Sequence, residues 1–328
     1  MKAVLLGTSG CIAMDATTAH RAGPSVLVEC GRHNEILLFD CGRSALQSVF
    51  EAGYSPANIG YVFFTHHHSD HNIGFPDLVL SSWVAFGKSH WRVYGPVGTR
   101  HFIDALFGRG GAFDADITRR AEAPDARKVL EKFTGRPMVR PSFDVHEIEK
   151  EGEVCCGEDW SVMASFAPRH VQPWLVSVAY RVESAAGSLV ISGDTAPTQQ
   201  MVELARGCSM LIHDCSIDQR EGVFADVHMH TDPRSLGRIA AEAGVNTVVA
   251  YHFLRFVDNP ETLSLFKQLV EEGFPGKVVI ADDCLVLDVS SGEYYHSRVS
   301  SRVARGSCGP SRQSGGGPMI EKVLGNSG

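Results

Sequence analysis

The residues best suited to chemistry stand together in the hexapeptide His-His-His-Ser-Asp-His at residues 66–71. It directly follows an apolar run that predicts a buried strand, so it begins at a strand end where side chains can converge. His66 and His68 point to the same side of an extended segment, because side chains alternate along it. Asp70 and His71 follow one tight turn later and can supply a second pair of ligands. Imidazole and carboxylate groups bind zinc, iron, nickel or manganese, and zinc is the commonest metal at His-rich sites.

A surface histidine cluster or a chance run is the alternative interpretation of this hexapeptide. The chain has 15 histidines in 328 residues, so isolated histidines carry little information. Four potential ligands among six residues, placed immediately after a buried strand, favour a metal site.

The elements that must position these ligands alternate along the chain. Apolar runs bounded by Gly, Pro, Asn and Asp indicate strands, and longer amphipathic segments indicate helices. Two halves of mixed strands and helices predict a layered α/β sandwich with its helices outside. We predict strands at residues 2–6, 25–29, 35–39, 60–65, 91–94, 145–148, 161–166, 176–182, 188–192, 210–214, 247–251 and 277–280, and helices at 44–52, 99–107, 126–133, 199–205 and 234–243.

The His-x-His-x-Asp-His pattern after a strand resembles the signature of the metallo-β-lactamase-fold hydrolases. The closest likeness is to their ribonuclease Z and arylsulfatase-like branch, whose landmarks resemble residues 5–10, 39–42 and 192–195. The resemblance covers roughly residues 1–290. It implies a four-layer αββα sandwich with a one- or two-metal site at one edge of the sheets.

The resemblance also implies a complete ligand set, in which every later member follows an apolar strand. We therefore expect a zinc-dependent enzyme that holds two zinc ions per chain. The implied ligands are His66, His68 and His170 for the first metal, Asp70, His71 and His252 for the second, and Asp194 as the bridge between them.

Two further residues resemble functional positions of the family. Asp40 matches a carboxylate that fixes the tautomer of a ligand histidine; it could also cap a helix that begins near Ser44, and both roles could hold together. His230 aligns with the histidine of a His-Ser-Thr element that assists the leaving group or stabilises the transition state. The helix that follows favours His230 over His228, and a slip of one step would exchange them. We expect Asp70 and His230 to be the catalytic residues.

The expected reaction is hydrolysis by a hydroxide that two metals share. Ribonuclease Z carries a tRNA-gripping arm between its third histidine ligand and its bridging aspartate. Here two predicted strands and a turn fill the segment between His170 and Asp194, and the net charge is −8. Both observations favour a small-molecule substrate (an aryl sulfate, phosphoester, lactone or activated aryl halide) and make nucleic acid an unlikely partner. The alternatives are a ribonuclease Z-like RNA-processing phosphodiesterase, an iron-dependent oxygenase and a catalytically silent metal-binding module.

Composition predicts one hydrolase domain at residues 1–296, with a helical insertion or cap at 108–141. Residues 297–328 are rich in Ser, Gly and Arg and predict a flexible tail. No apolar run approaches the ~20 residues of a membrane span, and the first residues do not resemble a signal peptide. Nine cysteines, an odd number scattered along the chain, suit reduced thiols. We expect a cytoplasmic homodimer that does not bind membranes.

Overall fold

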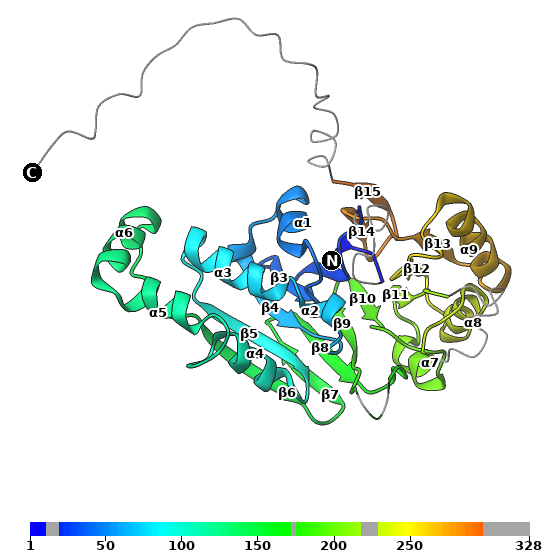
Figure 1. The fold of residues 1–328 in the computed structure, drawn as a ribbon. Helices are drawn as coiled ribbons and strands as arrows, with labels where there is room; N and C mark the ends of the chain where they lie inside the picture. The colour runs from blue at the N-terminus through cyan, green and yellow to red at the C-terminus, as the bar shows by residue number, and fades with distance from the viewer. Residues whose placement is uncertain (11–19, 172, 174, 218–228, 298–328) are drawn as a thin grey trace, which may run out of the picture.

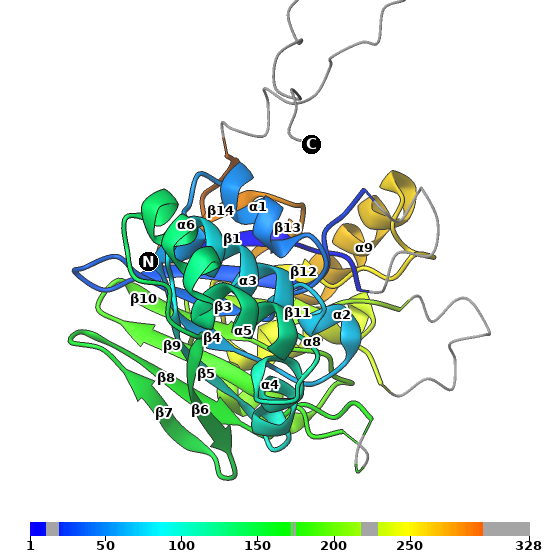
Figure 2. The ribbon, with the colours of Figure 1, turned by 60° about the vertical axis from the view of Figure 1, so that its left-hand side comes forward.

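A computed structural model describes residues 1–10, 20–171, 173, 175–217 and 229–297 of the chain. Two β-sheets lie face to face, and helices cover the outer face of each (Figures 1 and 2). This is the four-layer αββα sandwich that the sequence predicts, so the predicted fold class is confirmed.

The first sheet has eight strands in the order β15-β14-β1-β2-β3-β4-β5-β6. Its strands β3, β4, β5 and β6 are parallel neighbours, whereas β1, β2, β14 and β15 pair antiparallel. The strands are β1 (Lys2–Gly7), β2 (Ser25–Cys30), β3 (Glu35–Phe39), β4 (Ile59–Phe63), β5 (His90–Pro96), β6 (Ser142–Ile148), β14 (Leu285–Asp288) and β15 (Tyr294–His296).

The second sheet has seven strands in the order β13-β12-β11-β10-β9-β8-β7. Here β10, β11, β12 and β13 are parallel, and β7, β8 and β9 form an antiparallel meander that joins β10. The strands are β7 (Gly152–Cys156), β8 (Trp160–Ser165), β9 (Ala179–Ser184), β10 (Gly187–Ile191), β11 (Met210–Asp214), β12 (Thr247–Tyr251) and β13 (Lys277–Ile280).

The apolar core lies on both sides of the first sheet, because its strands are buried on both faces. In β1, Leu5 packs between the sheets, whereas Val4 and Leu6 pack under the helices. Such continuously apolar strands are typical of a sheet covered on two sides. The outer helices of the first sheet are α1 (Ala45–Glu51), α3 (Phe75–Phe86) and α4 (Thr99–Phe107); those of the second are α7 (Gln199–Ala205), α8 (Pro233–Ala243) and α9 (Pro260–Gly273).

Helices of the second half begin at clear sequence signals. Asp232 caps α8 by accepting hydrogen bonds from the backbone N–H groups of Arg234 and Ser235, and Pro233 occupies the first helical turn. Asn259 caps α9 in the same way, again directly before a proline. These caps fix where the loops before the helices end.

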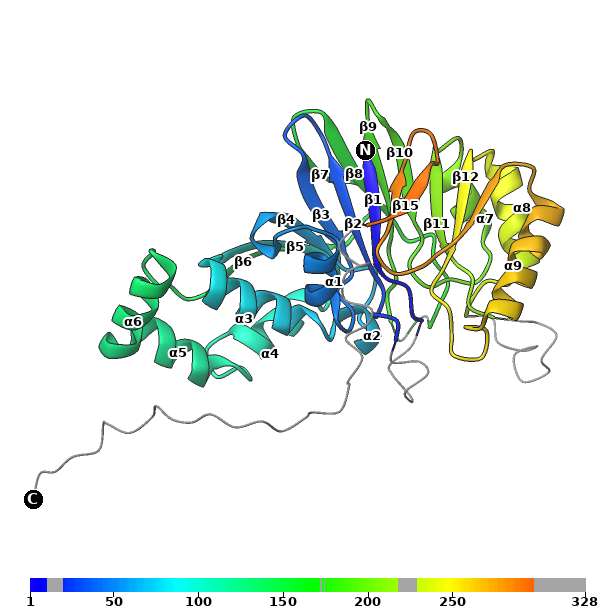
Figure 3. The same cartoon turned by 90° about the horizontal axis from the view of Figure 1, so that it is seen from above.

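The remaining helices are α2 (Ser69–Asn72), α5 (Asp114–Glu122) and α6 (Pro124–Thr134). The expected helical insertion at 108–141 contains α5 and α6, which project beyond the sandwich in Figures 1 and 3. Its role as a cap stays a prediction. All of the expected tail except Ser297 lies outside the described residues. Among the described residues, no helix combines the length and apolar character that a membrane span requires.

Candidate metal centre

One edge of the sandwich collects the polar residues that follow its parallel strands. Asp40 follows β3 and His66 lies just beyond β4 in the first sheet. Asp194 follows β10, Asp214 ends β11 and His252 follows β12 in the second sheet. Because parallel strands end at the same edge, residues that are far apart in the sequence meet there.

The carboxylate of Asp194 lies at the centre of this cluster. Its Oδ1 is 3.3 Å from His71 Nε2 and 3.1 Å from His252 Nε2. Its Oδ2 is 3.7 Å from the Nε2 atoms of both His66 and His170. Each oxygen of one carboxylate therefore faces a different pair of histidines, which is the arrangement that a bridging ligand requires.

Two residues complete the cluster at its more exposed side. His68 Nδ1 lies 3.2 Å from His170 Nε2. An oxygen of Asp70 lies 3.7 Å from the Nε2 atoms of both His71 and His252. The structure thus brings together all seven predicted ligands, and the candidate ligand atoms within each group lie within 4.8 Å of one another. The groups are His66, His68, His170 and Asp194, and Asp70, His71 and His252.

Four of the histidines are held by their outward-facing nitrogen. This contact fixes the ring orientation and leaves Nε2 directed into the cluster, as neutral histidine ligands need. The partners of the Nδ1 atoms are Thr65 Oγ1 for His66 (3.0 Å), Asp40 Oδ2 for His71 (2.8 Å), the Met229 carbonyl for His170 (2.9 Å) and Ser216 Oγ for His252 (2.9 Å).

Burial leaves two polar atoms of the cluster without a hydrogen-bond partner, His66 Nε2 and Asp194 Oδ1. Burial also lowers the pKa of His66, so its ring is neutral and offers a lone pair. Burial opposes ionisation of Asp194, but His252 and His71 outweigh it and hold the pKa of this carboxyl well below its usual value. Unpartnered buried polar atoms are costly unless something binds them. The residues present therefore fit a metal ion.

Asp40 supports the cluster from the end of β3. Its carboxylate accepts hydrogen bonds from the backbone N–H and the hydroxyl of Thr65, each at 2.8 Å, and contacts His71 as described above. Its backbone is left-handed, with φ 57°, a conformation that Asp adopts more readily than most residues. The N-cap position of α1 is Ser44, so the alternative role of Asp40 as that cap is wrong.

His230 stands beside the cluster with a buried carboxylate behind it. Its Nδ1 is 2.8 Å from Asp214 Oδ2, and its ring centre is 5.0 Å from that of His170. Burial opposes protonation, but the charge of Asp214 outweighs it and raises the pKa of His230 to about 9. His230 can therefore hold a proton at neutral pH. A ring nitrogen of His230 also lies within 4.8 Å of ligand atoms of Asp194 and His252.

Asp214 is the functional candidate that sequence reasoning missed. It is fully buried, and it also accepts a hydrogen bond from the backbone N–H of Thr195. The available signal was its position, since it ends an apolar strand directly beside the strand that leads to Asp194. His228, the alternative to His230, lies outside the described residues.

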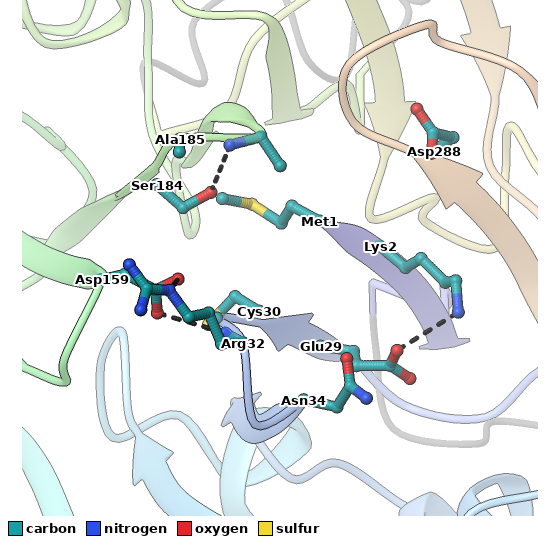
Figure 4. A pocket seen from close by; sticks show the side chains of 12 residues that line it. Met1, Lys2, Glu29, Cys30, Arg32, Asn34, Asp159, Ser184, Ala185 and Asp288 are labelled. Atoms are coloured by element: carbon teal, nitrogen blue, oxygen red, sulfur yellow. Dashed lines mark hydrogen bonds and ion pairs between the residues drawn. The ribbon is translucent and has the colours of Figure 1, made fainter.

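A second concentration of charge lies at the opposite edge of the sandwich. A cavity of about 340 Å³ opens there between the start of β1, the turn after β2 and the β9–β10 turn (Figure 4). Four of its five charged side chains are paired with one another: Lys2 Nζ lies 3.2 Å from Glu29 Oε1, and Arg32 Nε lies 3.6 Å from Asp159 Oδ2. No histidine lines this cavity among the described residues.

Comparison with known proteins agrees with this fold. Residues 35–253 match the family described as "Beta-lactamase superfamily domain". The chain therefore belongs to the β-lactamase superfamily, and within it to the metallohydrolases of the ribonuclease Z branch. A ribonuclease Z from Mycobacterium marinum is 30% identical over 292 residues, covering 85% of this chain and 95% of that protein.

More distant relatives give the same result. A ribonuclease Z from Methanosarcina acetivorans is 26% identical over 310 residues, covering 88% of this chain and 98% of that protein. The crystal structure of human tRNase Z, short form, superposes with a TM-score of 0.62 at 20% identity, covering 88% of this chain and 99% of that one. At that identity the superposition supports the fold alone.

These relatives overturn the expected partner. The prediction of a small-molecule substrate, with nucleic acid unlikely, is wrong, because the similar proteins are ribonucleases. One physical reason is that a net charge of −8 is a sum over 328 residues and does not describe any single surface. The other is that the short β9–β10 hairpin excludes a tRNA-gripping arm only between His170 and Asp194, and says nothing about RNA contacts elsewhere on the surface.

Proposed function

We propose that this chain is a zinc-dependent phosphodiesterase that cleaves RNA, with precursor tRNA as its substrate. The observation that carries the proposal is the Asp194 carboxylate, whose two oxygens each face a separate pair of histidines. Likeness to ribonuclease Z proteins along 85% of the chain supports RNA as the substrate class.

Two zinc ions would be held by the seven residues of the cluster. When bound, such ions lower the pKa of a water molecule and neutralise the negative charge that develops on a phosphodiester. The first ion would lie among His66, His68 and His170, the second among Asp70, His71 and His252, with Asp194 between them.

The chain's own residues would manage the protons. Burial opposes ionisation of Asp70, but His71 and His252 outweigh it and lower its pKa to about 2, so this partly exposed carboxylate is ionised and can orient the attacking water by accepting a hydrogen bond from it. His230 carries a proton at neutral pH and can give it from Nε2 to the oxygen that leaves phosphorus. Asp214 keeps His230 in position and stabilises its charged form.

The test is cleavage of an end-labelled precursor tRNA by the zinc-loaded protein. We expect endonucleolytic cleavage, and we expect Asp194→Asn to reduce it to background and to lower the zinc content. The substitution conserves the size of the side chain and removes the charge that faces both metal positions.

Asp159→Asn, at the opposite edge of the sandwich, is the matched control and should cleave normally. Intact precursor tRNA in the presence of a protein that hydrolyses bis(p-nitrophenyl) phosphate would refute RNA as the substrate. Cleavage that survives Asp194→Asn would come from another site.

A further inference from the structure

The segment at residues 108–141, which contains α5 and α6, is positively charged in a chain that is otherwise acidic. It has eight lysines and arginines against five aspartates and glutamates, a net charge of +3, whereas the whole chain carries −8. Figures 1 and 3 show α5 and α6 extending away from the two sheets, beyond β5 and β6. This segment therefore presents a surface of its own.

Ion pairs neutralise every acidic residue of the segment, and each uses a different arginine. The net positive charge of the segment therefore lies on the lysines and arginines that are not in these pairs. The pairs are Asp114–Arg140 (2.7 Å), Asp116–Arg120 (2.8 Å), Glu122–Arg109 (2.6 Å), Asp125–Arg119 (2.9 Å) and Glu131–Arg127 (2.7 Å).

Three cations of the segment make no ion pair with any described residue: Lys128, Lys132 and Arg136. Lys128 and Lys132 are four residues apart in α6, so they lie about one turn apart on one side of the helix, and Arg136 follows directly after the Gly135 that ends it. All three are exposed.

Two large apolar side chains each follow one of these lysines in the sequence, so they form the neighbouring row on α6. Phe133 is 83% exposed and Val129 is 67% exposed. We call these five residues, Lys128, Val129, Lys132, Phe133 and Arg136, the α6 cationic face. An exposed aromatic ring beside exposed cations is the combination on which single-stranded nucleic acid binds in many proteins.

We propose that the α6 cationic face binds the substrate RNA away from the metal centre, and this inference rests on the proposed function. Its three cations would contact backbone phosphates, which releases counterions, and Phe133 would stack on an unpaired base. The unpaired cations favour an anionic partner, and the RNA of the proposed function supplies a phosphate at every nucleotide. No member of the α6 cationic face belongs to the metal cluster, so the face would affect binding rather than the chemical step.

The test compares a triple variant, Lys128→Gln/Lys132→Gln/Arg136→Gln, with a matched control, Lys150→Gln/Arg206→Gln/Lys267→Gln. The control removes two exposed lysines and one exposed arginine elsewhere on the surface. We expect the α6 triple variant to raise the KM for precursor tRNA about 10-fold and to reduce the salt dependence of binding by a slope of about 2. Both triple variants should hydrolyse bis(p-nitrophenyl) phosphate, which is too small to reach α6, at the unaltered rate.

Phe133→Ala tests the stacking contact separately. We expect about a 10-fold weaker affinity for RNA, with Phe133→Tyr close to the unaltered protein. Because the ring is 83% exposed, its removal leaves the core intact.

The outcomes separate this inference from the proposed function. If the protein cleaves precursor tRNA and the α6 triple variant does so with the same KM and salt slope, the inference is wrong and the function stands. If the α6 triple variant alone loses salt-dependent RNA binding, but neither the unaltered protein nor the control variant cleaves RNA, the α6 cationic face binds RNA and the proposed function is wrong. If Phe133→Ala instead changes only the oligomeric state, the face contacts a second copy and the inference is overturned.

Discussion

The two edges of the sandwich both carry charged side chains, but these differ in their exposure to water and in their pairing. At the edge of Figure 4, Arg32 and Asp159 are partly open to water and paired with each other. At the candidate metal centre, His66 and Asp194 are buried, and one polar atom of each has no hydrogen-bond partner. Charged residues therefore do not define the site by type. The site is defined by three properties of its residues: they are buried, hydrogen bonds orient their side chains, and some of their polar atoms have no hydrogen-bond partner.

The largest expected effect in this comparison comes from His230, which lies beside the metal cluster. We expect His230→Ala to reduce RNA cleavage by about 10²–10⁴-fold, the usual contribution of a general acid. Hydrolysis of a p-nitrophenyl phosphodiester should fall far less, because that leaving group departs without a proton. Zinc content should not change. A variant that loses zinc would contradict the role of proton donor and make His230 a ligand, which its distance to Asp194 and His252 also allows.

A smaller effect is expected at Asp40, which contacts the candidate ligand His71. Asp40→Asn keeps an oxygen for the backbone N–H of Thr65 but removes the charge beside His71 Nδ1. We expect zinc affinity to fall by about 10–100-fold, measured by competition with a chelator. Asn tolerates left-handed backbone as Asp does, so the change isolates the charge. Unaltered affinity would mean that Asp40 only supports the loop.

The smallest effect is expected at the opposite edge. Asp159→Asn should leave RNA cleavage and zinc content unchanged and lower the free energy of unfolding by at most about 1 kcal/mol, because exposed ion pairs contribute little. The measurement is denaturant unfolding alongside the cleavage assay. A clear loss of cleavage would show that the two edges are coupled and would contradict the claim that only the candidate metal centre takes part in the reaction.

Much of the fold could be predicted from the sequence because its strands are short apolar runs with abrupt polar ends. The predicted ranges for β3, β11, β12, β13, α4 and α7 coincide with the structure. The predictions omitted α3 and α9, although α9 has a clear Asn-Pro start. In α3 the sequence Phe75–Phe86 is apolar on most sides, since it packs under α1 and α6 as well as on the sheet, and this hides the helical period.

The site was predictable where residue type and strand position coincide, as in residues 66–71. Asp214 was not predicted, because its role depends on which strand lies beside β10, and sheet order cannot be seen in a single sequence. The substrate was predicted wrongly for a related reason. Charge was summed along the whole chain, whereas a partner meets only the charges that folding gathers on one surface and leaves unpaired.

The proposed metal ligands come from both sheets and from residues as far apart as His66 and His252. A nascent chain that has not yet reached β12 lacks the last of them, so it can hold metal only weakly, whatever the metal supply. If the cluster holds zinc as proposed, the energy of coordination adds to the free energy of folding. Metal availability during synthesis would thus govern how much folded protein accumulates, before any substrate is met.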